Sequence, residues 1–467
     1  MTDFKNYQSP FTWRYGTEPM RQLWSEHHKR LLWRRIWVAL AETQSDYGIV
    51  TPLQAADLRA HMDEVDLERS LAIEQEIKHD LMAEIRVFAG QAPMGGAILH
   101  LGATSMDVED NADALRLRQS LDVTLSSLAS LLGILVLLIN RYADTPLIAY
   151  THLQPAEPST LGYRLALYAQ DLLEDFRQIR IQRGSVRGKG FKGAVGTGAS
   201  YAELIGRENL AGFENKLSEA LGLSFYPVTG QTYPRKQDYV ILSALAGVGQ
   251  SLYKIAFDIR LLQSPSIGEM AEPFGSRQVG SSAMPFKRNP IQAEKIDSLG
   301  RYLAGLPRVA WDNAAHSLLE RTLDDSANRR IILPEAFLAI DEMLKTASEI
   351  FSDLHVDEKA MGRNLSLYGP FAATERVLMA AVKAGADRQQ MHELIRSHAL
   401  RAGGDIQEGK ANSLEDLLSQ DENLAKYLSR EQLHELMKYE SHLGDAPERA
   451  RQLTLQIKNE IKSKAGT

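Results

Sequence analysis

The stretch ADALRLRQSLDVTLSSLASLLGILVLLINRY, residues 112–142, decides the fold class. From residue 121 to residue 139 it is apolar except for Asp122, Thr124 and three serines. A helix that is apolar on every side either lies buried among other helices or crosses a membrane. Asp122 and Arg141 bracket the apolar part closely, and no second segment of this kind is evident. We therefore interpret it as a helix buried in a large bundle, and we expect no membrane partner.

The neighbouring sequence continues this helical pattern. Strand signals are scarce, and residues 225–228 are the best short candidate. Long helices joined by short connections predict an all-α protein built on a helix bundle. We expect three domains, at residues 1–110, 111–356 and 357–467, with the long helices in the middle one. The helices expected from apolar spacing are residues 31–47, 70–88, 112–142, 160–183, 235–262, 290–304 and 333–351.

Composition narrows the class of function. The 467 residues are 44% hydrophobic and 24% charged, with a net charge of -7 and no long basic run, so nucleic acid is not an expected partner. Cysteine is absent, which excludes disulfides and thiolate metal sites and favours a reducing cytoplasm. The first ten residues lack the basic-then-apolar pattern of a signal peptide. No metal-ligand spacing is present, and we expect no metal.

The segment GSSAMPFKRNP, residues 280–290, is too polar and too interrupted to be core. It places Ser281, Ser282 and Lys287 on one connector. A mobile loop that carries a hydroxyl beside a cation is a common way to close a site over substrate. Asn289 is a candidate helix cap, and Glu294 falls within the first turn of the helix that follows.

Two further segments place polar groups next to helix starts. HLGATSMD, residues 100–107, predicts a turn entering a helix, which is either a carboxylate site or a plain N-cap. THLQPAEP, residues 151–158, holds two prolines that exclude a helix, so His152 is presented at a helix junction. An imidazole titrates near neutral pH, so His152 is a candidate general acid, although a lone histidine is often structural.

Two other segments have competing interpretations. GKGFKG, residues 188–193, matches the G-x-G-x-x-G dinucleotide pattern, but it follows a helix and no βαβ unit surrounds it, so we reject a nicotinamide site. A glycine-rich connector close to a ligand remains an alternative. ERTLDDSANRR, residues 320–330, carries Arg321, Ser326 and Arg330, which could converge on a phosphate or form a solvated, salt-bridged face.

These motifs together resemble a known family. Residues 281–290 match the fumarase/aspartase superfamily pattern Ser-Ser-x-Met-Pro-x-Lys-x-Asn-Pro at every defined position. The wider set resembles the adenylosuccinate lyase branch over residues 10–400. The resemblance implies a nearly all-helical, three-domain subunit whose long helices form the central bundle of a homotetramer. The strings that carry it are Arg14-Tyr15, His79-Asp80, HLGATS, THLQPAEP, TGQTY at residues 229–233, the loop above and ERTLDDSANRR.

The resemblance also implies roles for individual residues. Ser281 would be the general base and His152 the general acid, and Glu294 would pair with a histidine or lysine of the site. Lys78 and Lys295 stand where arginine is common in related proteins, and lysine loses the guanidinium fork. The implied catalytic residues are His152, Ser281, Lys287, Glu294 and His79. The implied substrate-binding residues are Arg14, Tyr15, Lys78, Asp80, Thr104, Ser105, Thr151, Gln231, Lys295, Arg321, Ser326 and Arg330.

The implied reaction is β-elimination of fumarate from adenylosuccinate, giving AMP, and from SAICAR, giving AICAR. Removing a proton next to a carboxylate builds negative charge that preorganised donors must receive. A serine is a poor base in water and needs a stabilised alkoxide, for which Lys287 and the loop backbone are candidates. The implied chemistry requires no metal or organic cofactor. From the residues alone Ser282 remains an alternative base, and another superfamily lyase, such as argininosuccinate lyase, or a catalytically silent helical scaffold remain alternative functions.

Overall fold

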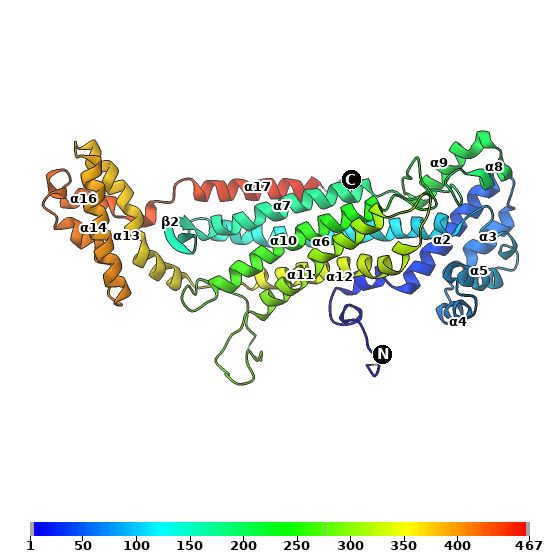
Figure 1. Ribbon diagram of the computed structural model, residues 1–467, viewed down its shortest axis with the longest axis horizontal. Helices are drawn as coiled ribbons and strands as arrows, with labels where there is room; N and C mark the ends of the chain where they lie inside the picture. The colour runs from blue at the N-terminus through cyan, green and yellow to red at the C-terminus, as the bar shows by residue number, and fades with distance from the viewer. Residues whose placement is uncertain (1–3, 276, 464–467) are drawn as a thin grey trace. The chain divides into compact units, whose positions relative to one another are not determined.

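The computed structural model describes residues 4–275 and 277–463 and confirms the all-α class (Figure 1). Several helices are much longer than the average of about three turns. All five expected long helices are present. The helix expected at residues 112–142 begins earlier, at Ser105, and the last two extend further than apolar spacing indicated, because each continues through an internal proline, Pro307 or Pro334. The long helices are α6 (Ser105–Arg141), α7 (Leu161–Ser185), α10 (Lys236–Leu262), α11 (Ile291–Ala315) and α12 (Asp324–Ser352).

The chain divides into two compact units, each built from three separate stretches of sequence. The first comprises Met1–Leu128, Asp175–Leu252 and Asp297–Lys345, and the second comprises Ala129–Glu174, Tyr253–Ile296 and Thr346–Thr467. Each of the five long helices contributes residues to both units. The division into three domains at residues 110 and 356 stays a prediction.

The first unit begins with short helices around a buried centre that includes Trp37, Phe88 and Leu58. The helix expected at residues 31–47 is confirmed within α2, but the one expected at residues 70–88 is wrong as a single helix. It breaks because Lys78 adopts the left-handed conformation (φ 58°), which ends α4, and His79 then caps α5. The helices of this unit outside the long ones are α1 (Glu18–Leu23), α2 (Glu26–Asp46), α3 (Pro52–His61), α4 (Leu67–Ile77), α5 (Asp80–Gln91), α8 (Ala199–Ile205) and α9 (Leu210–Leu221).

The second unit contains a β-hairpin between α6 and α7. Strands β1 (Pro146–Thr151) and β2 (Gln154–Thr160) pair antiparallel, and two residues at the tip have positive φ, which is the geometry of a tight hairpin turn. The strand expected at residues 225–228 is wrong, since Phe225 forms a single bridge with Gly188 and no ladder. A second small sheet pairs β3 (Met270–Ala271) with β4 (His355–Val356).

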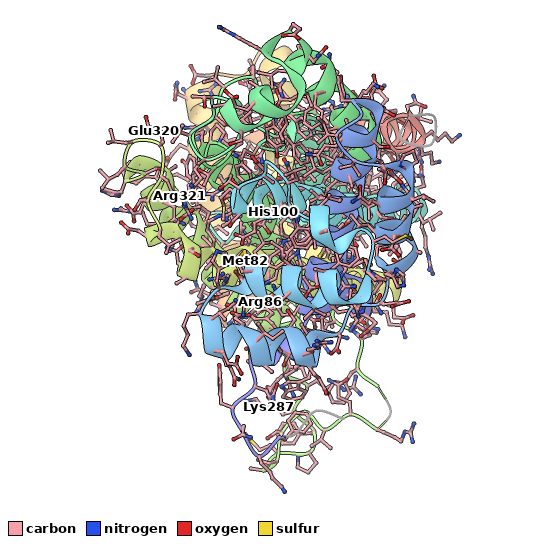
Figure 2. The ribbon with its side chains drawn as sticks, turned by 90° about the vertical axis from the view of Figure 1, so that its right-hand side faces the viewer. Met82, Arg86, His100, Lys287, Glu320 and Arg321 are labelled. Atoms are coloured by element: carbon pink, nitrogen blue, oxygen red, sulfur yellow. The ribbon has the colours of Figure 1, made fainter. Side chains whose placement is uncertain are left out.

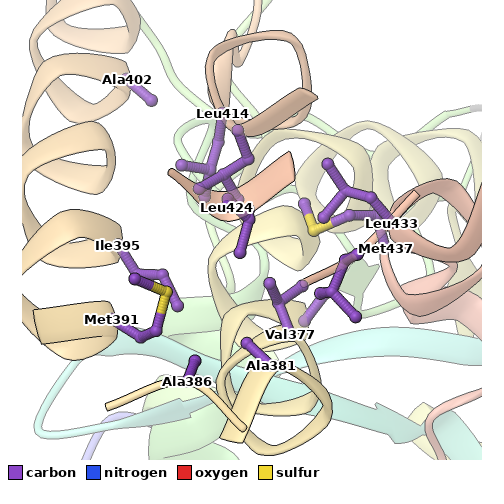
Figure 3. Packing of buried hydrophobic residues seen from close by; sticks show 13 residues of the cluster. Val377, Ala381, Ala386, Met391, Ile395, Ala402, Leu414, Leu424, Leu433 and Met437 are labelled. Carbon is purple, nitrogen blue, oxygen red and sulfur yellow. The ribbon is translucent and has the colours of Figure 1, made fainter. Parts of the chain in front are cut away.

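The C-terminal helices of the second unit have an apolar cluster of their own (Figure 3). Val377, Leu414, Leu424 and Leu433 are at most 3% exposed in it. The helices that contribute to the cluster are α13 (Glu358–Lys383), α14 (Arg388–Gln407), α15 (Leu414–Ser419) and α16 (Arg430–Leu436), and α17 (Ala446–Ser463) follows them outside the cluster. Short 3-10 helices in the described chain are Pro10–Thr12, Gly96–Ile98, Arg207–Asn209, Leu424–Lys426 and Tyr439–Ser441.

Two helices, α6 and α10, are long and apolar enough to cross a membrane by length and composition. The expectation that no second such segment exists is therefore wrong. The most apolar stretches of α6 and α10 are 44% and 50% buried, so neither helix is covered on all sides by the rest of this chain. Leu137 on α6 is 72% exposed and Phe257 on α10 is 54% exposed.

Candidate active site

The loop at residues 280–290 is closed at its base and exposed at its tip. The side-chain amide of Asn289 donates to the Gly280 carbonyl at 2.8 Å. A Cβ on Gly280 would lie 1.9 Å from the Lys287 carbonyl oxygen, so glycine is required for this close approach. Ser281 is partly buried, residues 282–288 are exposed, including Phe286 at 82%, and Figure 2 shows Lys287 among these exposed side chains.

The two serines of this loop differ in their surroundings. Ser281 Oγ accepts hydrogen bonds from the backbone N–H groups of Met284 at 3.1 Å and Ala283 at 3.3 Å. Donors that point at a hydroxyl oxygen favour its ionised form. Ser282 is exposed and makes no hydrogen bond within the described ranges. Ser281 and Ser282, which residue chemistry alone left as alternative bases, therefore differ in the donors that reach their hydroxyl oxygens, and the role of either as a base stays a prediction.

The helix after the loop is capped by a residue that the sequence did not single out. The Glu272 carboxylate accepts from the Gln292 N–H at 3.0 Å and the Ala293 N–H at 2.9 Å, at the start of α11. The prediction that Asn289 caps this helix is wrong, because its side chain closes the loop instead. Glu294 in the first turn lies 3.8 Å from Arg260, measured from Oε1 to Nη2, so its partner in this chain is an arginine.

His152 occupies the tip of the hairpin and not the junction of two helices, which corrects the sequence prediction. His152 and Leu153 have φ values of 52° and 59°, and both are exposed. Positive φ is uncommon for residues other than glycine, and here it is the geometry that the two-residue hairpin turn requires. Thr151 pairs with Gln154 directly below the tip. No hydrogen bond joins His152 to Ser281 within the described part of this chain.

Four predicted substrate-binding residues meet at one cavity of about 100 Å³ in the first unit. Arg330 connects three of them, since it donates to Asp80 at 3.0 Å and to Ser326 Oγ at 3.2 Å. Arg321 lies in the same wall and donates to Asp325 at 2.7 Å. The arginines of this segment are therefore ion-paired, as one of its two sequence interpretations expected, and the convergence of Arg321, Ser326 and Arg330 on a phosphate stays a prediction. The nearby positive charges hold the pKa of Asp80 below its usual value despite burial.

The scaffold behind this cavity is a buried charged network that sequence reasoning missed. Arg235 donates to both oxygens of Asp110 at 3.1 Å, and the Tyr233 N–H donates to the same carboxylate at 2.7 Å. Arg329 donates to Asp238 at 2.8 Å. Each of these residues pairs with one that lies far away in the sequence, so no local pattern could indicate the pairing. Removing one partner of a buried pair of this kind is strongly destabilising, because it leaves the other charge buried without compensation.

Several other predicted site residues lie on connectors or at helix starts. Arg14 and Tyr15 precede Gly16, whose N–H donates to Glu342 at 3.1 Å. Thr104 and Ser105 stand at the start of α6, where the first backbone N–H groups of a helix have no partner within the helix itself. Lys295 follows Glu294 in the first turn of α11.

The turn that carries Gln231 is fixed through its backbone. The Gln231 N–H donates to the Glu320 carbonyl at 2.9 Å. A Cβ on Gly230 would lie 2.6 Å from the same carbonyl oxygen, so the turn and the segment before α12 approach too closely for a larger residue. Figure 2 shows Glu320 and Arg321 together on that segment. This contact places the Gln231 turn next to the arginines of the cavity wall.

The glycine-rich connector at residues 188–193 has a structural role. The fully buried Asp107 carboxylate accepts from the N–H groups of Lys192 and Gly193 at 3.2 Å, and it pairs with Lys189. Asn111 accepts from the Gly190 N–H at 3.0 Å. The amides that could have held a ligand are therefore occupied by side chains of α6, which agrees with the rejection of a nicotinamide site.

Comparison with known proteins gives the family. A family model described as "Lyase" matches residues 21–305, and a second, described as "Adenylosuccinate lyase C-terminus", matches residues 370–453. A curated adenylosuccinate lyase from Schistosoma mansoni is 41% identical over 90% of this chain and 89% of its own length. The chain belongs to the adenylosuccinate lyase family. Another relative of that name, from Saccharomyces cerevisiae, is 38% identical over 96% of this chain and 94% of its own length.

Solved structures confirm the fold. A fumarate lyase from Mesorhizobium sp. BNC1 superposes with a TM-score of 0.83 at 25% identity, covering 96% of this chain and 99% of that one. A 3-carboxy-cis,cis-muconate lactonizing enzyme from Pseudomonas putida superposes with a TM-score of 0.85 at 25% identity, covering 97% of this chain and 100% of that one. Because these two neighbours carry the names of different reactions, the fold alone does not fix the chemistry, and the site residues must be argued separately.

Proposed function

We propose that this chain is a carbon–nitrogen lyase that cleaves adenylosuccinate to AMP and fumarate, and SAICAR to AICAR and fumarate. The family membership supports the reaction class. The observation that carries the catalytic assignment is the pair of backbone N–H groups that donate to Ser281 Oγ within the exposed loop. Together they provide a hydroxyl whose ionised form is stabilised on a loop that is free to meet a substrate.

In this proposal Ser281 removes the proton next to the succinyl carboxylate. The electron pair left on carbon is shared with that carboxylate, and Lys287 together with hydroxyls such as Thr104 and Ser105 stabilises the added charge. The C–N bond then breaks, and His152, in its imidazolium form, gives a proton to the departing nitrogen. These steps need no metal or organic cofactor.

We assign the remaining contacts to the same proposal. Asp80, Arg321, Ser326 and Arg330 hold the nucleotide part, because they already converge on one cavity and guanidinium groups bind phosphate in a forked geometry. The other proposed site residues are Arg14, Tyr15, Lys78, His79, Thr151, Gln231, Glu294 and Lys295.

We further propose a homotetramer in which several subunits contribute to each site. The exposed apolar side chains on α6 and α10 support this, since single folded chains seldom leave large apolar surfaces in water. No hydrogen bond joins the predicted catalytic residues Ser281 and His152 to each other within the described part of the chain, which fits a site completed by another subunit. A cytoplasmic location, expected from the composition, belongs to the same proposal.

The decisive measurement is an ultraviolet assay of adenylosuccinate cleavage by the purified protein. Ser281→Ala and His152→Ala are each expected to abolish fumarate release while the protein stays folded, and Ser282→Ala serves as the matched control that retains activity. Loss of activity in the Ser282 variant with retention in the Ser281 variant would move the base to the second serine.

Mixing the two inactive variants tests the shared site. If subunits exchange, some mixed sites combine an intact Ser281 with an intact His152, so part of the activity should return. Demonstrated exchange without any return of activity would refute a shared site. Cleavage of argininosuccinate in place of adenylosuccinate would favour another superfamily lyase, and inertness towards both would favour a silent scaffold.

A further inference from the structure

Glu109 lines the same cavity as Arg321, Ser326 and Arg330, and neither the motifs nor the mechanism above uses it. It lies on α6, one position before the ion-paired Asp110. Within the part of the chain that the structure describes, Glu109 has no hydrogen bond and no ion pair. Glu109 is therefore a carboxyl group in the wall of the proposed nucleotide site, and its oxygens have no hydrogen-bond or ion-pair partner among the described residues.

The charged groups around Glu109 come from every element that forms the cavity. Each cation already has a carboxylate partner nearer than Glu109. Arg330 on α12 pairs with Asp80, Arg321 with Asp325, and Arg235 with Asp110. The other pairs in the cavity wall are Lys29 with Glu26 on α2, Arg116 with Asp113 on α6, and Arg329 on α12 with Asp113.

This arrangement controls the protonation of Glu109. Burial, followed by the negative charges of Asp80, Asp113 and Asp110, raises the pKa of Glu109 to about 8, and Arg330 opposes the shift only in part. At neutral pH the group is therefore mostly a neutral acid, which has an O–H to donate.

We propose that Glu109 in its neutral form donates a hydrogen bond to the phosphate of the nucleotide held by Arg321, Ser326 and Arg330, and that its ionisation weakens nucleotide binding. An O–H donor to an anionic oxygen makes a short, charge-assisted hydrogen bond. An ionised carboxylate at the same place would repel the phosphate. Glu109 is thus a binding residue that couples the nucleotide to a proton, and this inference rests on the proposed function.

The coupling has a defined sign. A bound phosphate adds negative charge beside Glu109 and so stabilises its protonated form further. Binding should then take up a proton wherever the free group is ionised. Near pH 8, where about half of the free sites are ionised, about 0.5 proton should be taken up per site, and at higher pH the affinity should fall up to about tenfold per pH unit.

Isothermal titration calorimetry of the full-length protein with AMP tests this between pH 7 and pH 9.5. Repeating each titration in buffers of different ionisation enthalpy gives the number of protons taken up. Glu109→Gln is expected to abolish the uptake and to make the Kd for AMP independent of pH above 7. Glu219→Gln, an exposed glutamate on α9, is the matched control and should behave as the unmodified chain does.

A second variant separates the loss of the titrating group from the loss of the hydrogen-bond donor. Glu109→Ala also removes the titrating group, but it cannot donate a hydrogen bond, so at pH 7 it should bind AMP about fivefold more weakly than Glu109→Gln does, the equivalent of one hydrogen bond. If Glu109 had a role in packing alone, the two variants would not show both this difference in AMP affinity and the loss of proton uptake. The inference is overturned if the unmodified chain binds AMP without proton uptake at pH 8, or if Glu109→Gln keeps the alkaline loss of affinity.

Fumarate release separates this inference from the proposed function. Absence of fumarate release from adenylosuccinate, with proton-coupled AMP binding intact, would refute the assigned reaction and leave the role of Glu109 standing. Fumarate release with AMP binding that is insensitive to pH, or with no AMP binding at all, would refute the role of Glu109 and leave the assigned reaction standing.

Discussion

Replacing Glu109 with glutamine should also stabilise the folded protein, by an amount that depends on pH. Glutamine has nearly the same shape as the protonated glutamic acid and cannot ionise. The carboxyl group has an ordinary pKa of 4.5 and a pKa of about 8 in the folded chain. Between these two values the unfolded chain releases a proton that the folded chain retains, so stability falls as the pH rises through this window.

The size of the effect follows from the two pKa values. One unit of pKa difference corresponds to about 1.4 kcal/mol. Linkage then gives a penalty to the native chain of about 1 kcal/mol at pH 5 and on the order of 3 kcal/mol at pH 7. The penalty levels off above pH 8, where the folded group also ionises. The variant lacks this penalty, so its advantage in the free energy of unfolding should grow across this range.

Thermal unfolding at matched subunit concentrations, measured at several pH values from 5 to 8.5, checks this prediction. The concentrations must match because, in the proposed oligomer, association of the chains itself raises the midpoint. The quantity to compare is the difference in midpoint between Glu109→Gln and the unmodified chain at each pH. A difference that stays constant with pH, or that shrinks towards pH 8, would refute the argument that Glu109 is held neutral by its surroundings.

Two further changes test the loop and the helix that follows it. Gly280→Ala should reduce fumarate release at least about tenfold with little change in the unfolding midpoint, because the new Cβ would lie 1.9 Å from the Lys287 carbonyl oxygen in an exposed loop. Steady-state rates and thermal unfolding measured together test this prediction, and full activity of the variant would contradict it. Glu272→Ala should cost about 1–2 kcal/mol by removing the cap of α11, measured by denaturant unfolding, and an unchanged midpoint would mean that the cap contributes nothing.

The fold class could be predicted from the sequence because periodic apolar spacing repeats over long segments. The places where prediction failed depend on single backbone positions. Residues 70–88 have a continuous helical pattern, yet Lys78 adopts the left-handed conformation and divides it, and His79 caps the helix that follows. Pro307 and Pro334 lie inside α11 and α12. The first of these helices was expected to end at residue 304, before Pro307, and the second to begin at residue 333, next to Pro334. Tertiary packing overrides local preference at such points.

The candidate site was predictable where a motif fixes the residues and not where distant side chains meet. Arg321, Ser326 and Arg330 occur within one string, and the structure brings them to one cavity with Asp80. The hairpin that presents His152 could have been suspected from its prolines, which disfavour a helix, but the two positive φ values at its tip carry no glycine signal. A turn of this kind forms because the flanking strands pair and determine its geometry.

Glu272 and Glu109 show that the role of a glutamate can be assigned only when the groups around its carboxylate are known. Burial raises the pKa of both carboxyl groups. Glu272 accepts hydrogen bonds from two backbone N–H groups, which favour its charged form and oppose that shift, so it can cap α11 as an anion. Glu109 receives no such donor in the described chain and faces three carboxylates, so nothing offsets its burial except the charge of Arg330. The same type of side chain is therefore a hydrogen-bond acceptor at one site and, in our proposal, a hydrogen-bond donor at the other, and the difference lies in which groups point at it.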